Sequence, residues 1–222
     1  LHKVFEEVRK QARKRGVRVT GSEIVGLIPF KAIYNSGLYY LKKQKSQLGI
    51  PTKDIINTAI HSLGLNDIYK FNSKEKIIEY KIAKENHFPE MKLKSFVNNI
   101  SRPTPTPGGG SVAALGGALG SSLASMVSNL SIVKKGLEKH INFHNDRSIK
   151  CQNNLDRLLT LIDEDSISYD NVIKALRLPK KTKNDITIRN KELIIATKNA
   201  ADAPMKVLSC CNKVLSDCLD IA

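Results

Sequence analysis

One stretch, residues 101–133, constrains the fold more than any other part of the chain. It reads SRPTPTPGGGSVAALGGALGSSLASMVSNLSIV, so three prolines in five residues precede three consecutive glycines. A proline-stiffened turn that opens into a helix leaves main-chain N–H groups able to meet an anion. The large apolar residues that follow recur at spacings of three and four, which predicts one helical face: Val112, Leu115, Leu119, Leu123, Met126, Leu130 and Val133.

A second stripe of the same helix carries almost no side chain, because Gly116, Gly120, Ala124 and Ser128 recur every four residues. Such a stripe lets another helix backbone or a flat ligand come close, and tight helix packing is the simpler of these explanations. Small residues at this spacing also pair helices in lipid. Several serines and Asn129 interrupt the apolar run, so we expect no membrane partner.

The charge of the chain is strongly positive, at +15 over 222 residues. Nucleic acid is the usual partner for such a charge. However, only 5% of residues are aromatic, and no compact basic block with interleaved aromatics is present, so base-stacking platforms are scarce. A polyanionic small substrate would benefit equally from a positive field. We therefore do not expect nucleic acid binding, although a basic helical interaction or nucleic-acid-binding module remains the alternative of another class.

Cysteine usage and the first residues indicate the cellular context. The chain opens with Leu1 and shows no secretory signal, which suggests an internal piece of a longer cytoplasmic protein. Four cysteines lack any C-x-x-C pair, so we expect reduced thiols packed in helices.

The remaining patterns predict a mixed fold: a partial α+β subdomain over residues 1–80, a polar linker over 81–91, and an all-α helical-bundle domain over 92–222. Short alternating or apolar segments at 17–20 and 23–28 predict strands. Helical periodicity and punctuating Gly or Pro residues predict helices at 1–15, 30–45, 51–63, 73–80, 92–100, 110–133, 137–176 and 185–220, the last broken at Pro204.

Four segments carry a resemblance to known enzymes. Residues 94–131 resemble the start of formimidoyltetrahydrofolate cyclodeaminase, and LIDEDSISYDNVIKALRLPKKT, residues 161–182, looks like that family's D-x-D, aromatic and A-x-x-L-P-K pattern. VTGSEIVGLIPFKAI and FNSKEKIIEY, residues 19–33 and 71–80, look like the C-terminal subdomain of glutamate formimidoyltransferase. Their order is that of the bifunctional formimidoyltransferase-cyclodeaminase family.

The resemblance implies folate-dependent one-carbon metabolism in histidine breakdown. It implies conversion of 5-formimidoyltetrahydrofolate to 5,10-methenyltetrahydrofolate and ammonia, with tetrahydrofolate, in its simple or polyglutamylated form, as substrate and carrier. It also implies a homo-oligomer built through the helical domain, and no metal. Methenyltetrahydrofolate cyclohydrolase is the close enzymatic alternative. The resemblance places the transferase's catalytic histidine upstream of Leu1, and we expect further helices of the helical domain beyond residue 222, so the activity of the fragment itself stays open.

Release of ammonia needs proton transfer by a positioned acid or base. Asp163 and Asp165 match the family's D-x-D and are the candidate catalytic residues. They lie two positions apart, on roughly opposite faces of a helix, so at most one points into a site. A solvated helix end is the competing explanation.

Folate binding is expected at the glycine turn, through Pro107, Gly108, Gly109, Gly110 and Ser111. A further candidate is Lys180, which could meet a glutamate carboxylate of folate, although an exposed lysine is the plainer interpretation. His140 and His144 have a spacing that can bind metal, but no glutamate lies between them, and we expect a solvated face and no metal site.

Overall fold

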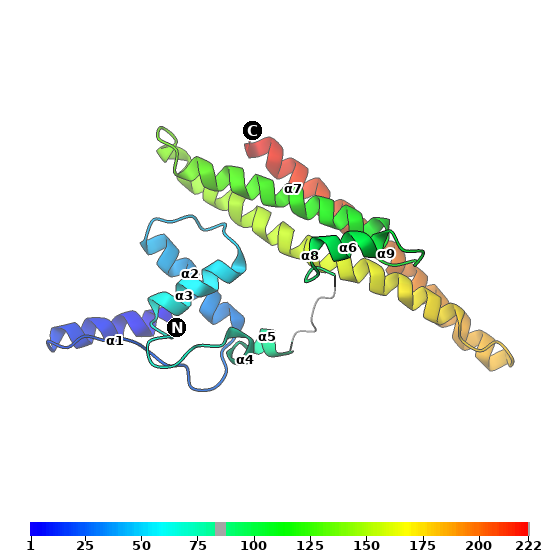
Figure 1. Ribbon diagram of the computed structural model, residues 1–222, viewed down its shortest axis with the longest axis horizontal. Helices are drawn as coiled ribbons and strands as arrows, with labels where there is room; N and C mark the ends of the chain where they lie inside the picture. Colours follow the sequence, from blue (N-terminus) through cyan, green and yellow to red (C-terminus); the bar gives the residue numbers. More distant parts are fainter. Residues whose placement is uncertain (83–87, 222) are drawn as a thin grey trace. The chain divides into compact units, whose positions relative to one another are not determined.

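The computed structural model describes residues 1–82 and 88–221 of the chain, and this part is mostly helical (Figure 1). It forms two compact units. The first comprises Leu1–Lys84 and Ser131–Ile149, and the second comprises Glu85–Leu130 and Lys150–Ala222. Each unit has its own hydrophobic core.

The first unit is built from short helices around large aliphatic side chains. Its helices are α1 (His2–Lys14), α2 (Phe30–Lys43), α3 (Thr52–Ser62), α4 (Ser73–Lys76) and α5 (Ile78–Ile82). Helices α2 and α3 cross closely at Gly37, where any Cβ would overlap the main chain of Ile55. The core beneath them contains Ile28, Ile33, Tyr40, Ile56, Ala59, Ile60, Leu63, Leu65 and Ile77.

Helix α1 is held to α2 by polar contacts. The Glu6 carboxylate accepts hydrogen bonds from the Tyr40 hydroxyl, at 3.2 Å, and from the Lys43 ammonium, at 2.5 Å. The Lys43 bond is the main reason that the pKa of Glu6 lies below its ordinary value. His2 also stacks on Tyr39, with ring centroids 4.3 Å apart. The amphipathic start of the chain thus becomes part of the first unit.

The strands expected at 17–20 and 23–28 are not shown. In the described part of this unit, extended backbone is paired only at a single parallel bridge between Ile28 and Ile77. A strand needs a neighbouring backbone along its length, and Val25, which is 89% exposed, has no such cover. The bridge also explains why the helix expected at 73–80 is interrupted: Ile77 is extended and separates α4 from α5. The helical part of the expected fold is present, but the described residues do not show the α+β character.

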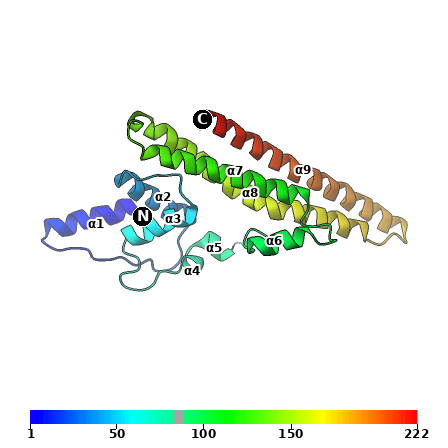
Figure 2. The ribbon, with the colours of Figure 1, turned by 45° about the horizontal axis from the view of Figure 1, so that its top comes forward.

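The second unit is a bundle of long helices, as expected from the sequence. It contains α6 (Leu93–Ile100), most of α7 (Gly109–Ile132), most of α8 (Ile141–Leu176) and α9 (Lys183–Ile221), and the short η1 (Glu138–His140) precedes α8 in the chain. Both views show α7, α8 and α9 lying side by side (Figures 1 and 2). Their shared core contains Phe96, Ala114, Ala118, Leu158, Leu161, Ile162, Val207, Cys210 and Val214.

Helix α7 turns its small residues inward, and its large apolar residues remain exposed. The buried face consists of Ser111, Ala114, Ala118, Ser121, Ala124, Ser125 and Ser128. The predicted apolar face is largely on the surface, with Leu119 58% and Leu123 59% exposed. Of the predicted small stripe, Ala124 and Ser128 are buried, whereas a Cβ on Gly116 would meet nothing. By length and composition α7 could cross a membrane, and it is the one helix of the described residues that meets this test.

Helix α9 is continuous through Pro204, so the predicted break is wrong. A proline removes one helical hydrogen bond and crowds the preceding turn. Here Ala203 and Val207, on either side of Pro204, are buried, and Val207 packs in the bundle core, which favours the uninterrupted helix. The helix also begins earlier than expected, because Thr182 and Asp185 form a reciprocal cap with bonds of 2.9 and 3.1 Å. These bonds lower the pKa of Asp185.

The predicted linker, residues 81–91, is structured where it is described. Lys81 and Ile82 complete α5, and Phe88 and Met91 pack against the core of the second unit. The remaining linker residues, 83–87, lie outside the described part of the chain.

Candidate functional site

Three consecutive acidic residues on α8 make three different sets of contacts. Asp163 is only 8% exposed and accepts a hydrogen bond from the main-chain N–H of Phe88, at 3.0 Å. Glu164 pairs with Arg157 on its own helix and lies 3.8 Å from the Lys206 ammonium of α9. Asp165 alone of the three faces the glycine turn. The expectation that the two aspartates diverge is therefore met by the geometry.

Asp165 packs directly on the first turn of α7. A Cβ on Gly110 would overlap the Asp165 carboxylate, so this contact requires glycine. The Ser111 hydroxyl lies 3.2 Å from the same carboxylate. The N-terminus of a helix carries a partial positive charge, which favours an adjacent carboxylate. The anion that the sequence predicted at this helix start is thus supplied, in the structure, by α8.

Ser111 lies inside the bundle rather than on an open surface. Its side chain is fully buried, and its hydroxyl lies 2.9 Å from the carbonyl oxygen of Ile162 and 3.1 Å from the Ser166 hydroxyl. Direct contact between Ser111 and a ligand, which the sequence suggested, would require this set of bonds to open.

The loop before α7 is fastened to α8. The Thr106 hydroxyl donates to Asp170, at 3.2 Å, and the Thr106–Pro107 peptide bond is cis. Pro107 is buried, whereas Gly109 is exposed and a Cβ there would meet nothing within 4 Å. Among the predicted folate-binding residues of this loop, Gly109 is therefore the exposed one, whereas Gly108 and Gly110 are partly buried.

Lys180 lies apart from the glycine turn. It is exposed and follows the end of α8 at Leu176. Leu176 is eleven residues beyond Asp165, a rise of about 16 Å along the helix axis. The structure of this chain therefore does not bring Lys180 together with the other predicted residues.

Sequence reasoning missed the hydroxyl groups that surround Asp165. Ser166 and Ser168 are buried, and the Ser168 hydroxyl donates to the main-chain oxygen of Asp165, at 2.8 Å. Helical spacing gives a signal for part of this cluster, because Ile162, Ser166 and Asp170 follow one another at intervals of four. The signal was not recognisable without knowing which face of α8 meets α7.

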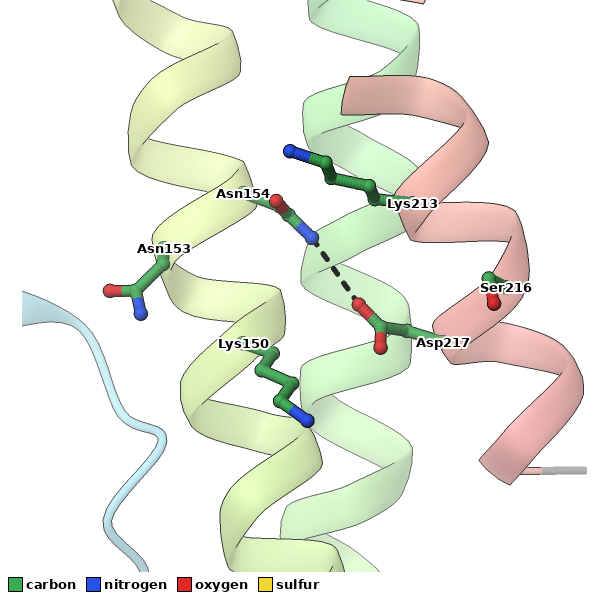
Figure 3. A pocket seen from close by; sticks show the side chains of 6 residues that line it. All are labelled: Lys150, Asn153, Asn154, Lys213, Ser216 and Asp217. Carbon is green, nitrogen blue, oxygen red and sulfur yellow. Dashed lines mark hydrogen bonds between the residues drawn. The ribbon is translucent and has the colours of Figure 1, made fainter. Parts of the chain in front are cut away.

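A hollow lies away from the glycine turn, between α8 and α9, closer to the C-terminus of α9 (Figure 3). It has a volume of about 280 Å³ and is open to solvent. The Asn154 amide donates to the Asp217 carboxylate, at 3.3 Å, and the ammonium groups of Lys150 and Lys213 lie beside this pair. Asn154 lies eleven residues before Asp165, so this hollow is about 16 Å along α8 from the glycine turn.

Other candidate ligands are dispersed. Among residues 1–82 and 88–221, no three His, Cys, Asp or Glu side chains are arranged to hold a metal ion. His140 belongs to η1 and His144 to α8. All four cysteines are thiols in α8 and α9, as expected, and burial raises the pKa of the Cys211 thiol.

The fold and the site define a class of protein: a helical bundle in which a glycine-opened helix start meets a single carboxylate, preceded by a smaller helical unit. Residues 92–222 match the family model described as formiminotransferase-cyclodeaminase, and residues 1–83 match the formiminotransferase domain. The chain belongs to the formiminotransferase-cyclodeaminase family, which confirms the resemblance found in the sequence.

Individual relatives support this assignment. The chain is 33% identical over 211 residues to the mouse (Mus musculus) formimidoyltransferase-cyclodeaminase. The aligned residues make up 93% of this chain and 39% of the relative. The Dictyostelium discoideum protein of the same name is 31% identical across the whole chain and 41% of its own length. A methenyltetrahydrofolate cyclohydrolase of Methylorubrum extorquens is 36% identical over 133 residues, 59% of this chain and 61% of the relative. The chain thus spans about two-fifths of the bifunctional relatives.

Proposed function

We propose that the second unit carries a folate-dependent cyclodeaminase centre that converts 5-formimidoyltetrahydrofolate to 5,10-methenyltetrahydrofolate and ammonia. The observation that carries the proposal is the Asp165 carboxylate held against Gly110 and Ser111 at the start of α7. It occurs within residues 92–222, the part that matches the cyclodeaminase family model. The bifunctional relatives are named formimidoyltransferase-cyclodeaminases, and the substrate and reaction proposed here are those that the resemblance to this family implies.

The chemistry needs one group that both accepts and donates a proton. The folate N10 nitrogen forms a bond to the amidine carbon and loses its proton. The former amidine nitrogen gains protons and leaves as ammonia, and one proton is taken up overall. A carboxylate beside the reacting carbon can accept the first proton and return one to the departing nitrogen. Of the two predicted catalytic residues, we assign this role to Asp165, because its carboxylate lies against Gly110 and Ser111.

The site also favours the charge of the substrate. An amidine is basic, and its protonated form carries a positive charge that a nearby carboxylate attracts. Gly109 is exposed and a Cβ there would meet no atom within 4 Å, so we propose that the folate ring approaches Asp165 from this side. Asp163, whose carboxylate binds the Phe88 main chain, holds the segment before α6 against α8 and has no part in the reaction.

The first unit adds the second half of the proposal. Residues 1–83 match the formiminotransferase domain, so we propose that the chain comes from a cytoplasmic enzyme that also transfers the formimidoyl group to folate. This half also separates the leading function from its alternative, methenyltetrahydrofolate cyclohydrolase, which is favoured by the Methylorubrum extorquens relative. A transferase segment upstream supplies the formimidoyl-folate that a cyclodeaminase consumes.

The test is a pair of substitutions in the intact protein. In Asp165→Asn, methenyl-folate formation from formimidoyl-folate is expected to fall by about 10²- to 10⁴-fold, with folate binding preserved. Asp163→Asn is the matched control, and it is expected to lower the melting temperature while turnover per folded molecule persists. Full turnover in Asp165→Asn would exclude this acid. Methenyl-folate hydrolysis without formimidoyl-folate turnover would favour the cyclohydrolase.

Folate binding at the glycine turn has its own test. Because a Cβ at Gly109 meets no protein atom, Gly109→Val changes the approach to the turn without disturbing packing. We expect weaker folate binding at an unchanged melting temperature. Equal affinity would show that folate does not approach the turn, and would leave the role of Asp165 to the preceding experiment.

We also propose that the helical unit assembles with a second copy. The neighbouring helices α7 and α9 each leave a row of large apolar side chains exposed at heptad spacing: Val112, Leu119, Leu123, Met126 and Leu130 on α7, and Met205, Leu208, Leu215 and Leu219 on α9. Monomeric proteins rarely expose contiguous apolar patches of this kind. Heptad rows on helices pair with one another in bundles.

Sedimentation of the intact protein tests the assembly. The wild-type protein is expected to sediment as an oligomer, and Leu123→Lys combined with Leu130→Lys is expected to shift it toward the monomer. A protein that sediments as a monomer at micromolar concentration would show instead that another part of the polypeptide, or another partner, covers the rows.

A further inference from the structure

Ser111 has more hydrogen-bond partners than its hydroxyl can serve at once. Its oxygen lies 2.9 Å from the Ile162 carbonyl oxygen, 3.2 Å from an oxygen of Asp165 and 3.1 Å from the Ser166 hydroxyl. A serine hydroxyl has one proton to donate and two lone pairs that accept. It can therefore donate to Ile162 or to Asp165, but not to both.

The charge of Asp165 decides between these two acceptors. A hydrogen bond to an ionised carboxylate is roughly twice as strong as one between neutral groups. The Ser111 proton is therefore drawn to Asp165 when that residue is ionised. When Asp165 is protonated, its own O–H can donate to Ser111, whose proton then turns to the Ile162 carbonyl. Ser166 donates to the Ser111 oxygen in the first arrangement and so strengthens the bond to Asp165.

We propose that Ser111 is a positioning residue whose hydroxyl holds Asp165 toward the glycine turn in both of its protonation states. The inference rests on the proposed role of Asp165 as the proton-transfer group. Full burial keeps water from replacing Ser111 in either arrangement. A carboxyl group that must give and take a proton in each cycle is thereby kept in one place without being locked in one charge state.

The chain offers a matched control on the same helix. Ser121 is also fully buried on α7, and its hydroxyl donates to a carbonyl oxygen of α8, that of Cys151, at 2.7 Å. In the described part of the chain, no carboxylate bonds to this hydroxyl. Ser111 and Ser121 are thus both fully buried on α7, and each hydroxyl lies within hydrogen-bonding distance of a main-chain oxygen of α8. Only Ser111 also has a carboxylate as a partner.

The experiment compares steady-state kinetics of Ser111→Ala and Ser121→Ala in the intact protein, with formimidoyl-folate as substrate. In Ser111→Ala, kcat is expected to fall by about 10- to 100-fold, because a hydrogen bond to a charged group is lost. KM is expected to stay within about twofold, because Ser111 is fully buried and its bonds would have to open before it could meet a ligand. Ser121→Ala is expected to lower the melting temperature by about as much as Ser111→Ala does, but to leave kcat normal.

Two further variants grade the effect. Ser111→Cys keeps the shape and a weak donor, so its kcat is expected to lie between those of the wild type and Ser111→Ala. Ser166→Ala removes only the supporting donor, and its kcat is expected to fall less than that of Ser111→Ala. Agreement of both variants with this order supports the positioning role, and a reversed order contradicts it.

The outcomes separate this inference from the proposed function. Asp165→Asn with collapsed turnover beside Ser111→Ala with normal kcat overturns the inference alone. Equal losses of kcat in Ser111→Ala and Ser121→Ala, in step with stability, also overturn it, because both serines would then act through packing. Full turnover in Asp165→Asn removes the proposed acid, and the inference falls with it.

Discussion

The two faces of α7 show opposite relations between side-chain size and burial. The inward face carries serines, alanines and Gly117, yet it is the face that meets α8 and α9. The outward face carries leucines, valines and a methionine that remain largely exposed. Small residues let the backbone of α7 approach its neighbours, and the large side chains Leu158, Leu161 and Ile162 of α8 fill the space between the helices.

Three of the hydroxyl groups buried on the inward face are bonded, which lowers the cost of burying them. The Ser128 hydroxyl has no hydrogen-bond partner among the described residues. Ser111 and Ser121 donate to main-chain oxygens of α8. The Ser125 hydroxyl accepts from the Gln152 amide, at 3.1 Å. An unbonded hydroxyl in the same place would lose its hydration without compensation. The comparison teaches that a face is buried according to what its neighbours can fill and bond, and not only according to its own hydrophobicity.

The strongest test of this comparison enlarges the inward face. Ala118→Leu is expected to destabilise the chain by about 1–3 kcal/mol or more, because the added side chain enters a filled core. Urea unfolding followed by circular dichroism measures the change. Leu119→Ala, one residue along on the exposed face, is the control and is expected to stay within about 0.5 kcal/mol. Similar losses in both variants would show that the two faces are equally packed.

A smaller change probes the same face at a glycine. A Cβ at Gly117 would lie 2.6 Å from the Cys211 sulfur and 3.2 Å from Leu158. Gly117→Ala is therefore expected to destabilise by about 1–2 kcal/mol, since overpacking outweighs the gain in helix propensity. A rise in melting temperature on Gly117→Ala would mean that Cys211 moves aside freely.

The neighbouring glycine, Gly116, is expected to show the opposite change in stability when it is replaced by alanine. A Cβ at Gly116 meets no atom within 4 Å. Gly116→Ala then gains helix propensity alone and is expected to stabilise by about 0.5–1 kcal/mol, measured by the same unfolding experiment. Destabilisation at this position would indicate that something covers Gly116 in solution, as the proposed assembly allows.

The least effect on stability is expected at the centre of the outward face. Leu123→Gln is expected to change the free energy of unfolding of the monomeric chain by no more than about 0.5 kcal/mol. In the proposed oligomer the same change would remove an apolar contact, so the midpoint would become dependent on protein concentration. A large loss at every concentration would show that Leu123 packs within its own protomer.

Periodicity in the sequence identified the helices, but it did not identify which side of α7 faces the core. Spacings of three and four select a face, and both the small and the large residues of α7 follow such spacings. Polarity does not identify the buried side either, because the serines lie among the small residues, on the side that is buried. The prediction of strands at 17–20 and 23–28 did not hold, for a different reason. Alternation predicts a strand only where a partner backbone exists, and Ile28 finds one at Ile77 alone.

The candidate site was predictable in its parts more than in its arrangement. The glycine turn and the D-x-D were visible as motifs, and helical geometry predicted that the two aspartates diverge. The contact between Gly110 and Asp165, and the enclosure of Ser111, depend on the rotation of α8 against α7. Nothing in the local sequence fixes that rotation. Lys180 was grouped with the site by its motif, although the length of α8 separates it from the turn.

The carboxylate at the start of α7 also determines which small molecules suit this turn. Phosphate, sulfate and carboxylate compounds commonly bind at helix N-termini. Here Asp165 already provides the negative group, and a second anion would be repelled by it. Compounds with an amidine or guanidine group, which are cationic and planar, match the turn better. The start of α7 looks like an anion site in the sequence, but in the folded chain we expect cationic compounds to bind there better than anionic ones.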